Sequence, residues 1–150
     1  EYFSLSKILD WRRKLSNFWE SNFKLDGFTW LSVEHYYQAN KFKTDNPDYY
    51  YQFTIESASE LSKNPALAKG AGGESGKFEG KKVRPDKIKM DKDFLVNKDT
   101  IMLNGQMAKY EQNDDLSDML KKTVTAKLLH YKRGTLPEVA TITMTIRSKI

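Results

Sequence analysis

The chain has 150 residues, of which 39% are hydrophobic and 30% are charged, and its formal net charge is +5; this length fits one domain with a core of its own. It contains no cysteine and only two histidines, His35 and His130, so disulfides, a cysteine nucleophile and a histidine-built metal cage are excluded, and we expect no metal or other cofactor. No apolar run is long enough to span a membrane and no export signal opens the sequence, so we expect a cytoplasmic protein without membrane contact.

The first clear element in chain order is a β-hairpin. Two short apolar segments flank the dipeptide Asp26-Gly27, which is typical of a two-residue type I′ turn. Such a turn needs positive φ, which glycine adopts freely. A helix is predicted directly afterwards, over residues 33–42, because Ser32 can cap its first turn and neither glycine nor proline interrupts it.

Two Asn-Pro pairs mark the next helix starts. Asn46-Pro47 and Asn64-Pro65 each combine a capping residue with a proline in the first helical turn. The second of these helices is predicted over residues 66–69, with Gly70 as its stop. Residues 70–92 are rich in glycine, lysine and arginine, which indicates either a solvated loop or a flexible basic wall of a ligand site.

The remaining chain is predicted to be mainly helical. A long helix is expected over 93–111, a short one around Leu116 to Leu120, and a strand or extended segment over 126–131. The tail has the apolar spacing of a helix that begins near Pro137, although its alternating threonines also fit a strand. Together these elements predict an α+β fold, a mainly helical single domain over residues 1–150 with a small antiparallel sheet near its N-terminus.

Three neighbouring motifs give the chain a family resemblance. They are Leu15-Ser16-Asn17-Phe18-Trp19, then Leu25-Asp26-Gly27-Phe28-Thr29-Trp30, then Glu34-His35-Tyr36-Tyr37-Gln38-Ala39-Asn40-Lys41-Phe42. In this order and spacing they resemble the NADAR family, also called YbiA-like. Weaker echoes of the family follow at Lys109-Tyr110-Glu111-Gln112-Asn113, Ala126-Lys127-Leu128 and Met144-Thr145-Ile146-Arg147.

This resemblance implies the compact YbiA-like α+β fold and N-glycosidase activity. Known members of the family hydrolyse the ribosylamino bond of riboflavin-pathway pyrimidine phosphates, and others act on ADP-ribose attached to nucleobases. The implied partner is therefore a phosphorylated riboside or an ADP-ribose-type ligand, with nucleic acid as a carrier of an ADP-ribosylated base. The charge of +5 suits such anions, although a lysine-rich composition also simply keeps a protein in solution.

Glu34 is the candidate catalytic carboxylate. Breaking a C–N bond at a ribose anomeric carbon passes through an oxocarbenium-like state, which a carboxylate can stabilise, attack, or support by activating water. The first turn of a helix favours a negative charge, which suits a base or stabiliser, but it also favours a glutamate for helix stability alone. Glu138 is the candidate second carboxylate, or else a helix-start glutamate.

The candidate substrate-binding residues lie around Glu34 and outside its helix. Tyr37, Gln38 and Lys41 share the Glu34 face of the predicted helix, a spacing that a solvated amphipathic face also has. Four further candidates are a turn amide, two aromatic rings and a guanidinium, namely Asn17, Phe18, Phe94 and Arg84. Phe94 stands where many family members place a base-stacking tryptophan. His35 points elsewhere on the helix, and we expect it to have a structural role.

The chain departs from the family pattern at residues 131–138. There the bacterial pattern has an aspartate before a Trp-Gly, and this chain has neither. Three functions therefore stay open on the sequence: a metal-free N-glycosidase, a non-catalytic ADP-ribose or nucleotide-binding module, and a protein that binds nucleic acid through its charge. No pattern indicates an oligomeric state.

Overall fold

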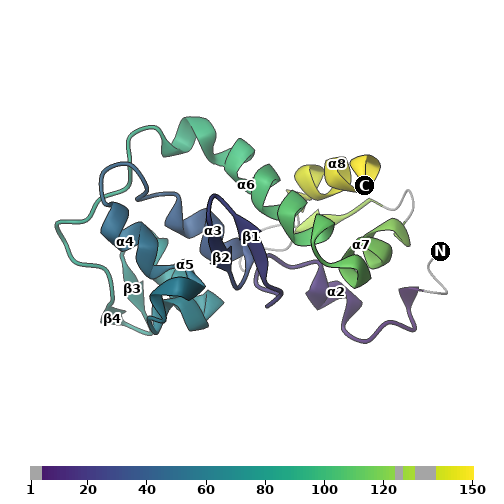
Figure 1. Cartoon of the computed structure of the whole chain (residues 1–150), viewed down its shortest axis with the longest axis horizontal. Coiled ribbons are helices and arrows are strands. Elements are labelled where there is room, and N and C mark those ends of the chain that lie inside the picture. Colours follow the sequence, from purple (N-terminus) through teal and green to yellow (C-terminus); the bar gives the residue numbers. More distant parts are fainter. Residues whose placement is uncertain (1–4, 124–126, 131–137) are drawn as a thin grey trace.

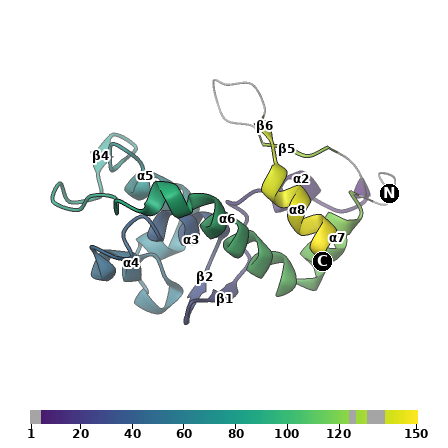
Figure 2. The ribbon, with the colours of Figure 1, turned by 90° about the horizontal axis from the view of Figure 1, so that it is seen from above.

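The computed structural model describes residues 5–123, 127–130 and 138–150, without the side chains of His130 and Glu138. A long helix, α6 (Phe94–Glu111), runs between two groups of elements (Figure 1). The hairpin and helices α3 to α5 lie on one side of it. The short helix α2 (Trp11–Lys14) lies with α7 (Asp114–Lys121) and α8 (Thr141–Lys149) on the other side, near the C-terminus (Figure 2).

The predicted N-terminal hairpin is confirmed. Strand β1 (Phe23–Leu25) pairs antiparallel with β2 (Phe28–Trp30). Asp26 and Gly27 have φ angles of 55° and 82°, and a type I′ turn requires positive φ at both positions. The Asp26 carboxylate accepts a hydrogen bond of 2.6 Å from the Tyr36 hydroxyl, which ties the turn to the following helix.

Helix α3 (Val33–Ala39) follows the hairpin directly. Ser32 caps it as predicted, because its hydroxyl accepts a 3.2 Å hydrogen bond from the His35 amide. The helix is shorter than predicted, since the Asn40 side chain bonds back to a helix carbonyl and the next two amides close three-residue turns. These tight turns place Phe42 in the core, where it is fully buried.

Both Asn-Pro pairs begin helices, as predicted. The two helices and the 3-10 turns between them are α4 (Pro47–Gln52), η1 (Ile55–Ser57), η2 (Leu61–Lys63) and α5 (Pro65–Gly72). The Asn64 side chain caps α5 by accepting from the Ala66 amide at 3.0 Å. The Asn46 side chain makes no cap and instead donates to the Lys89 carbonyl at 3.3 Å, which ties α4 to the loop before α6.

The stretch from residue 70 to residue 92 is shaped by close packing against α5. The predicted helix stop at Gly70 is wrong, because α5 continues to Gly72. A Cβ atom at Gly70 would lie 2.7 Å from the Lys77 carbonyl oxygen, so this glycine allows a strand to approach the helix. That strand, β3 (Lys77–Phe78), forms a small antiparallel hairpin with β4 (Lys81–Lys82).

The second half of the chain follows the predicted helical order. Helix α6 confirms the long helix, and α7 (Asp114–Lys121) confirms the short one. Strands β5 (Leu129–His130) and β6 (Glu138–Val139) pair antiparallel, which confirms the extended segment at residues 129 and 130. Helix α8 (Thr141–Lys149) begins later than predicted because Val139 belongs to β6; Pro137, Ala126 and Tyr131 lie outside the described residues.

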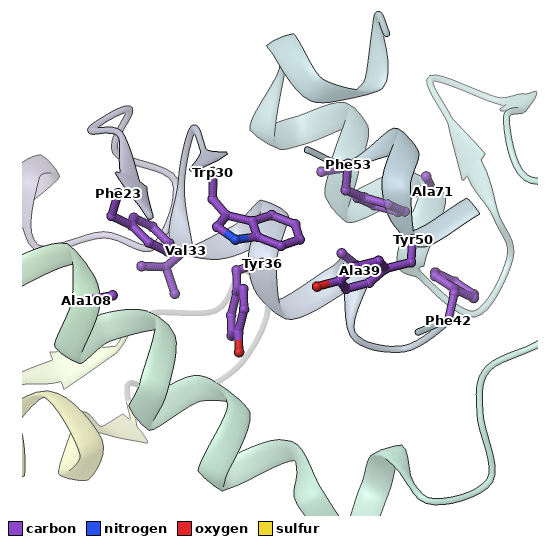
Figure 3. Packing of buried hydrophobic residues seen from close by; sticks show 11 residues of the cluster. Phe23, Trp30, Val33, Tyr36, Ala39, Phe42, Tyr50, Phe53, Ala71 and Ala108 are labelled. Atoms are coloured by element: carbon purple, nitrogen blue, oxygen red, sulfur yellow. The ribbon is translucent and has the colours of Figure 1, made fainter. Parts of the chain in front are cut away.

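The buried hydrophobic side chains form two clusters. The first lies among the hairpin and helices α3 to α5 and includes the fully buried Trp30 (Figure 3). The second joins α6, α7 and α8 and includes Leu116 and Ile146. Helix α6 contributes Ala108 to the first cluster and Tyr110 to the second. A single domain requires such a shared element, and the single-domain assignment stays a prediction.

The α+β prediction is confirmed: the described chain is mainly helical and its sheets are small antiparallel pairs. In the part of the chain that the structure describes, no helix combines the length and the apolar character needed to cross a bilayer.

Candidate active site

The side chains predicted to share one face of α3 with Glu34 make contacts along that face. The Gln38 side-chain amide donates a 2.7 Å hydrogen bond to the Glu34 carboxylate one turn earlier. One turn later, the Lys41 ammonium donates a 3.0 Å hydrogen bond to the Gly72 carbonyl at the end of α5. Glu34 is 7% exposed and Gln38 is 5% exposed, which excludes the alternative of a solvated amphipathic face for these two residues.

Two aromatic rings lie beside Lys41. The Tyr37 and Phe94 ring centroids are 5.2 Å apart with an angle of 74° between the planes. The Lys41 nitrogen lies 5.7 Å from the Tyr37 ring centroid and 5.6 Å from that of Phe94. Phe94 is 4% exposed and offers little ring surface, so its base-stacking role stays a prediction.

The charges of Lys41 and Glu34 act on each other. Burial lowers the pKa of Lys41, the Glu34 carboxylate raises it, and the Arg84 charge lowers it. Burial also raises the pKa of Tyr37, and the charges of Glu34 and Asp99 raise it further, so its hydroxyl stays protonated at neutral pH. The face therefore combines a carboxylate, an ammonium and a phenol within two helical turns.

The loop with the Ser16-Asn17-Phe18 motif docks on the first turn of α3. The Glu34 backbone amide donates a 3.0 Å hydrogen bond to the Asn17 carbonyl, which joins the first of the three motifs to the third. The Asn17 side-chain oxygen accepts a 3.2 Å hydrogen bond from Gln106 on α6. Phe18 is 36% exposed, and the Lys69 ammonium lies 5.7 Å from its ring centroid. A partly exposed ring and a cation thus adjoin the loop.

The other aromatic residues near the motifs belong to the cores. Trp30 is fully buried, and Phe28 packs edge-on against it at 6.4 Å between ring centroids. Trp19 packs against the second cluster. The hairpin rings Phe28 and Trp30 therefore belong to the first core cluster, and Phe18 is the exposed ring of its motif.

Arg84 is bound to the backbone at the end of α5. Its guanidinium donates to the carbonyls of Ala71, Gly73 and Glu74 at 2.8, 2.6 and 3.3 Å. These bonds hold the turn that follows Gly72, so Arg84 has a structural task at the edge of the site. Its phosphate-binding role stays a prediction.

The second carboxylate candidate, Glu138, is described only by its backbone. It lies in β6 opposite His130. Its side chain is outside the described residues, and so are residues 131–137, where the sequence departs from the family pattern. A catalytic role of Glu138 stays a prediction.

His35 is part of the scaffold. Its two ring nitrogens lie 2.8 Å from the Ser32 hydroxyl and 2.9 Å from the Leu61 carbonyl. The nitrogen next to the carbonyl must donate, so in a neutral ring the other nitrogen accepts from Ser32. His35 is fully buried, and burial lowers its pKa to about 4, which fits the predicted structural role.

Acidification should destabilise the fold through His35. Below its ordinary pKa of 6.5 the unfolded chain binds a proton at this residue, whereas the folded chain keeps it neutral down to about 4. The free energy of unfolding should fall between these two pH values, by on the order of 3 kcal/mol, and this group should cause no further loss at lower pH. Urea denaturation across this range will show the loss in the wild type and its absence in His35→Gln. Equal pH slopes for both proteins would count against it.

Two surface grooves are found among the described residues, and neither is lined by Glu34. One, of about 320 Å³, is lined by Asp26, Tyr36, Asp91 and Phe94 among others, and so borders the site at Phe94. The other, of about 540 Å³, lies beside α4 and is lined by apolar side chains such as Leu61.

Sequence-based prediction missed three residues that the structure adds to the site: Gln106, Lys69 and Gly72. Gln106 lies three residues before Lys109, so a polar stripe along the helix was the available signal. Gly72 lies with Ala68 and Ala71 on the buried face of α5, a spacing of small residues that permits close helix packing. No sequence signal marks Lys69.

Fold and site together define a class of protein: a mainly helical α+β domain in which one helix presents a buried carboxylate, an amide and a lysine beside an asparagine-containing loop. The chain belongs to the NADAR domain family, whose model matches residues 6–133.

The chain is similar to bacterial proteins that are named N-glycosidase YbiA. The Escherichia coli (strain K12) protein named N-glycosidase YbiA is 31% identical over 116 residues, and its Shigella flexneri serotype 5b counterpart is 32% identical. Each match covers 77% of this chain and spans 61% of the length of the relative. The NMR structure of the E. coli protein YbiA superimposes with a TM-score of 0.66 at 25% identity, covering 91% of this chain and 76% of that one.

Proposed function

We propose that this protein hydrolyses the N-glycosidic bond of a ribosyl-phosphate compound. The observation that carries the proposal is the buried Glu34 carboxylate, held at one oxygen by Gln38 and electrostatically coupled to Lys41. The relatives named N-glycosidase support it, and so do the family motifs in which these three residues stand.

The reaction uses Glu34 as the charge opposite the anomeric carbon. As the C1′–N bond breaks, its electron pair leaves with the base nitrogen and positive charge builds on the ribose, where a carboxylate stabilises it or activates the attacking water. Water adds to C1′, and its proton passes to the departing nitrogen. Gln38 fixes the orientation of the carboxylate, and catalysis depends on such positioning.

The groups beside Glu34 and on the adjoining loop support this substrate class. Lys41 and Lys69 supply positive charge for phosphate, while Tyr37 and Phe18 offer aromatic rings to a heterocycle. A ribosylaminopyrimidine phosphate of the riboflavin pathway and an ADP-ribosylated nucleobase, free or within nucleic acid, both combine these parts. Such charged compounds occur in the cytoplasm, and we therefore propose that the protein acts there.

A product assay tests the proposal directly. The protein is incubated with a ribosylaminopyrimidine phosphate, an ADP-ribosylated nucleoside and an ADP-ribosylated oligonucleotide, and released ribose 5-phosphate or ADP-ribose is measured with and without EDTA. Release that EDTA leaves unchanged supports a metal-free N-glycosidase. Tight ADP-ribose binding without release would instead establish a binding module. Affinity for unmodified DNA that falls steeply with salt would establish a charge-driven nucleic-acid protein.

Gly72→Ala should impair turnover by displacing Gln38. A Cβ atom at this position would overlap the Gln38 side-chain amide, which would have to leave the place from which it bonds to Glu34. We expect kcat/KM to fall by about 10- to 100-fold. The matched control is Gly73→Ala, whose Cβ would meet the Lys69 carbonyl at 3.2 Å, a contact that a small shift relieves. If both variants have the same activity, Gln38 does not orient the carboxylate.

A further inference from the structure

A polar stripe at the C-terminal end of α6 holds the chain segment that precedes β2. It continues one helix face beyond the helix end and consists of Gln106 and Lys109 on α6, the cap residue Gln112, and Asn113. All four bond to residues 14–24 of that segment. Three of them belong to the Lys109–Asn113 motif that the proposed function does not use. The motif therefore holds the loop before the hairpin and the first strand of the hairpin.

Lys109 is the most deeply buried member of this stripe. It is 1% exposed, and its ammonium donates to the Lys14 carbonyl at 2.7 Å and to the Ser16 carbonyl at 2.9 Å. Within the described residues no carboxylate pairs with it. A buried ammonium without a counter-charge destabilises a fold relative to an apolar residue of similar size. A purely structural position would thus be served better by methionine.

One of the two Lys109 bonds, to the Ser16 carbonyl, ends next to the contact that holds Glu34. Ser16 precedes Asn17, whose carbonyl accepts the 3.0 Å hydrogen bond from the Glu34 amide. Gln106 holds the Asn17 side chain, and the Thr143 hydroxyl on α8 orients Gln106 through a 2.6 Å hydrogen bond. The path from Lys109 to Glu34 thus consists of two hydrogen bonds and the backbone of Ser16 and Asn17.

We propose that Lys109 is a positioning residue that fixes the Ser16-Asn17 backbone and, through it, the first turn of α3 with Glu34. Its effect on turnover rests on the proposed function. Its effect on the Glu34 amide does not rest on that function. The positioning role of Lys109 and the proposed function can therefore be refuted separately.

The structural arm measures amide hydrogen exchange of the full chain by NMR. In Lys109→Met the Glu34 amide should exchange at least about 10-fold faster, because the Asn17 carbonyl is no longer held in place. The matched control is Gln112→Ala, which removes two bonds of 2.7 Å to the Lys24 backbone in the same segment, away from Asn17. Glu34 exchange should be unchanged in this control. Unchanged exchange in Lys109→Met, or equal acceleration in both variants, overturns the proposal.

The catalytic arm measures kcat and KM with whichever substrate of the product assay is hydrolysed. Lys109→Met should lower kcat about 10- to 100-fold with KM within about threefold, since misplacement of a catalytic group costs rate more than binding. Gln112→Ala should keep the wild-type kcat. If Lys109→Met does not fold, Lys109→Gln takes its place. This variant retains a hydrogen-bond donor, so its kcat should fall by less than the loss expected for Lys109→Met. A wild type that hydrolyses nothing refutes the proposed function, and the exchange data still decide the role of Lys109.

Discussion

Glu34→Gln should abolish turnover while the fold and ligand binding persist. The substitution removes the negative charge and keeps the shape, and the new amide oxygen can still accept the hydrogen bond from Gln38. Loss of a carboxylate that stabilises the cation or activates water should lower kcat by roughly 10²- to 10⁴-fold. Steady-state release of ribose 5-phosphate or ADP-ribose measures this loss, and calorimetry with ADP-ribose should give a Kd close to that of the wild type.

The control for this experiment is Glu111→Gln, the same change at an exposed position of α6. It should keep the wild-type kcat, which separates loss of the Glu34 carboxylate from a general effect of lowered negative charge. Turnover by Glu34→Gln within about threefold of the wild type would remove Glu34 from the reaction, since such a change is worth less than about 1 kcal/mol of barrier.

The largest loss of stability is expected from Trp30→Ala. Trp30 is fully buried, and its ring lies 5.1 Å from the Tyr36 ring centroid and 5.5 Å from that of Tyr50 (Figure 3). Its indole N–H donates a 2.9 Å hydrogen bond to the Leu25 carbonyl. Removing the ring leaves a cavity and takes away this hydrogen bond, so the free energy of unfolding should fall by about 3–5 kcal/mol.

Urea denaturation followed by circular dichroism measures this loss. The matched control is Leu95→Ala, which removes an apolar side chain that is 61% exposed; it should change the free energy of unfolding by less than about 0.5 kcal/mol. A loss below about 1.5 kcal/mol in Trp30→Ala would mean that the neighbouring rings collapse into the space, and that Trp30 does not anchor the first cluster.

Predictions from the sequence succeeded where the cause of a structure lies within a few residues. The Asp26-Gly27 turn follows from two positive φ angles, and the Ser32 cap follows from one hydroxyl at the start of a helix. Gly70 shows where this reasoning fails. Judged from the neighbouring residues alone, a glycine after a short helical segment indicates the end of a helix. In the structure Gly70 instead leaves room for the Lys77 carbonyl to approach the helix.

The sequence by itself determined the hairpin, the start of α3 and the face shared by Glu34, Gln38 and Lys41, because turn chemistry and the helical repeat act over short distances. Only the tertiary structure decided that Asn17 and Gln106, 89 residues apart, meet beside this face and that Gly72 closes against it. Periodicity states which side of a helix is buried. Which other element covers that side depends on the packing of the whole chain, and no local pattern encodes it.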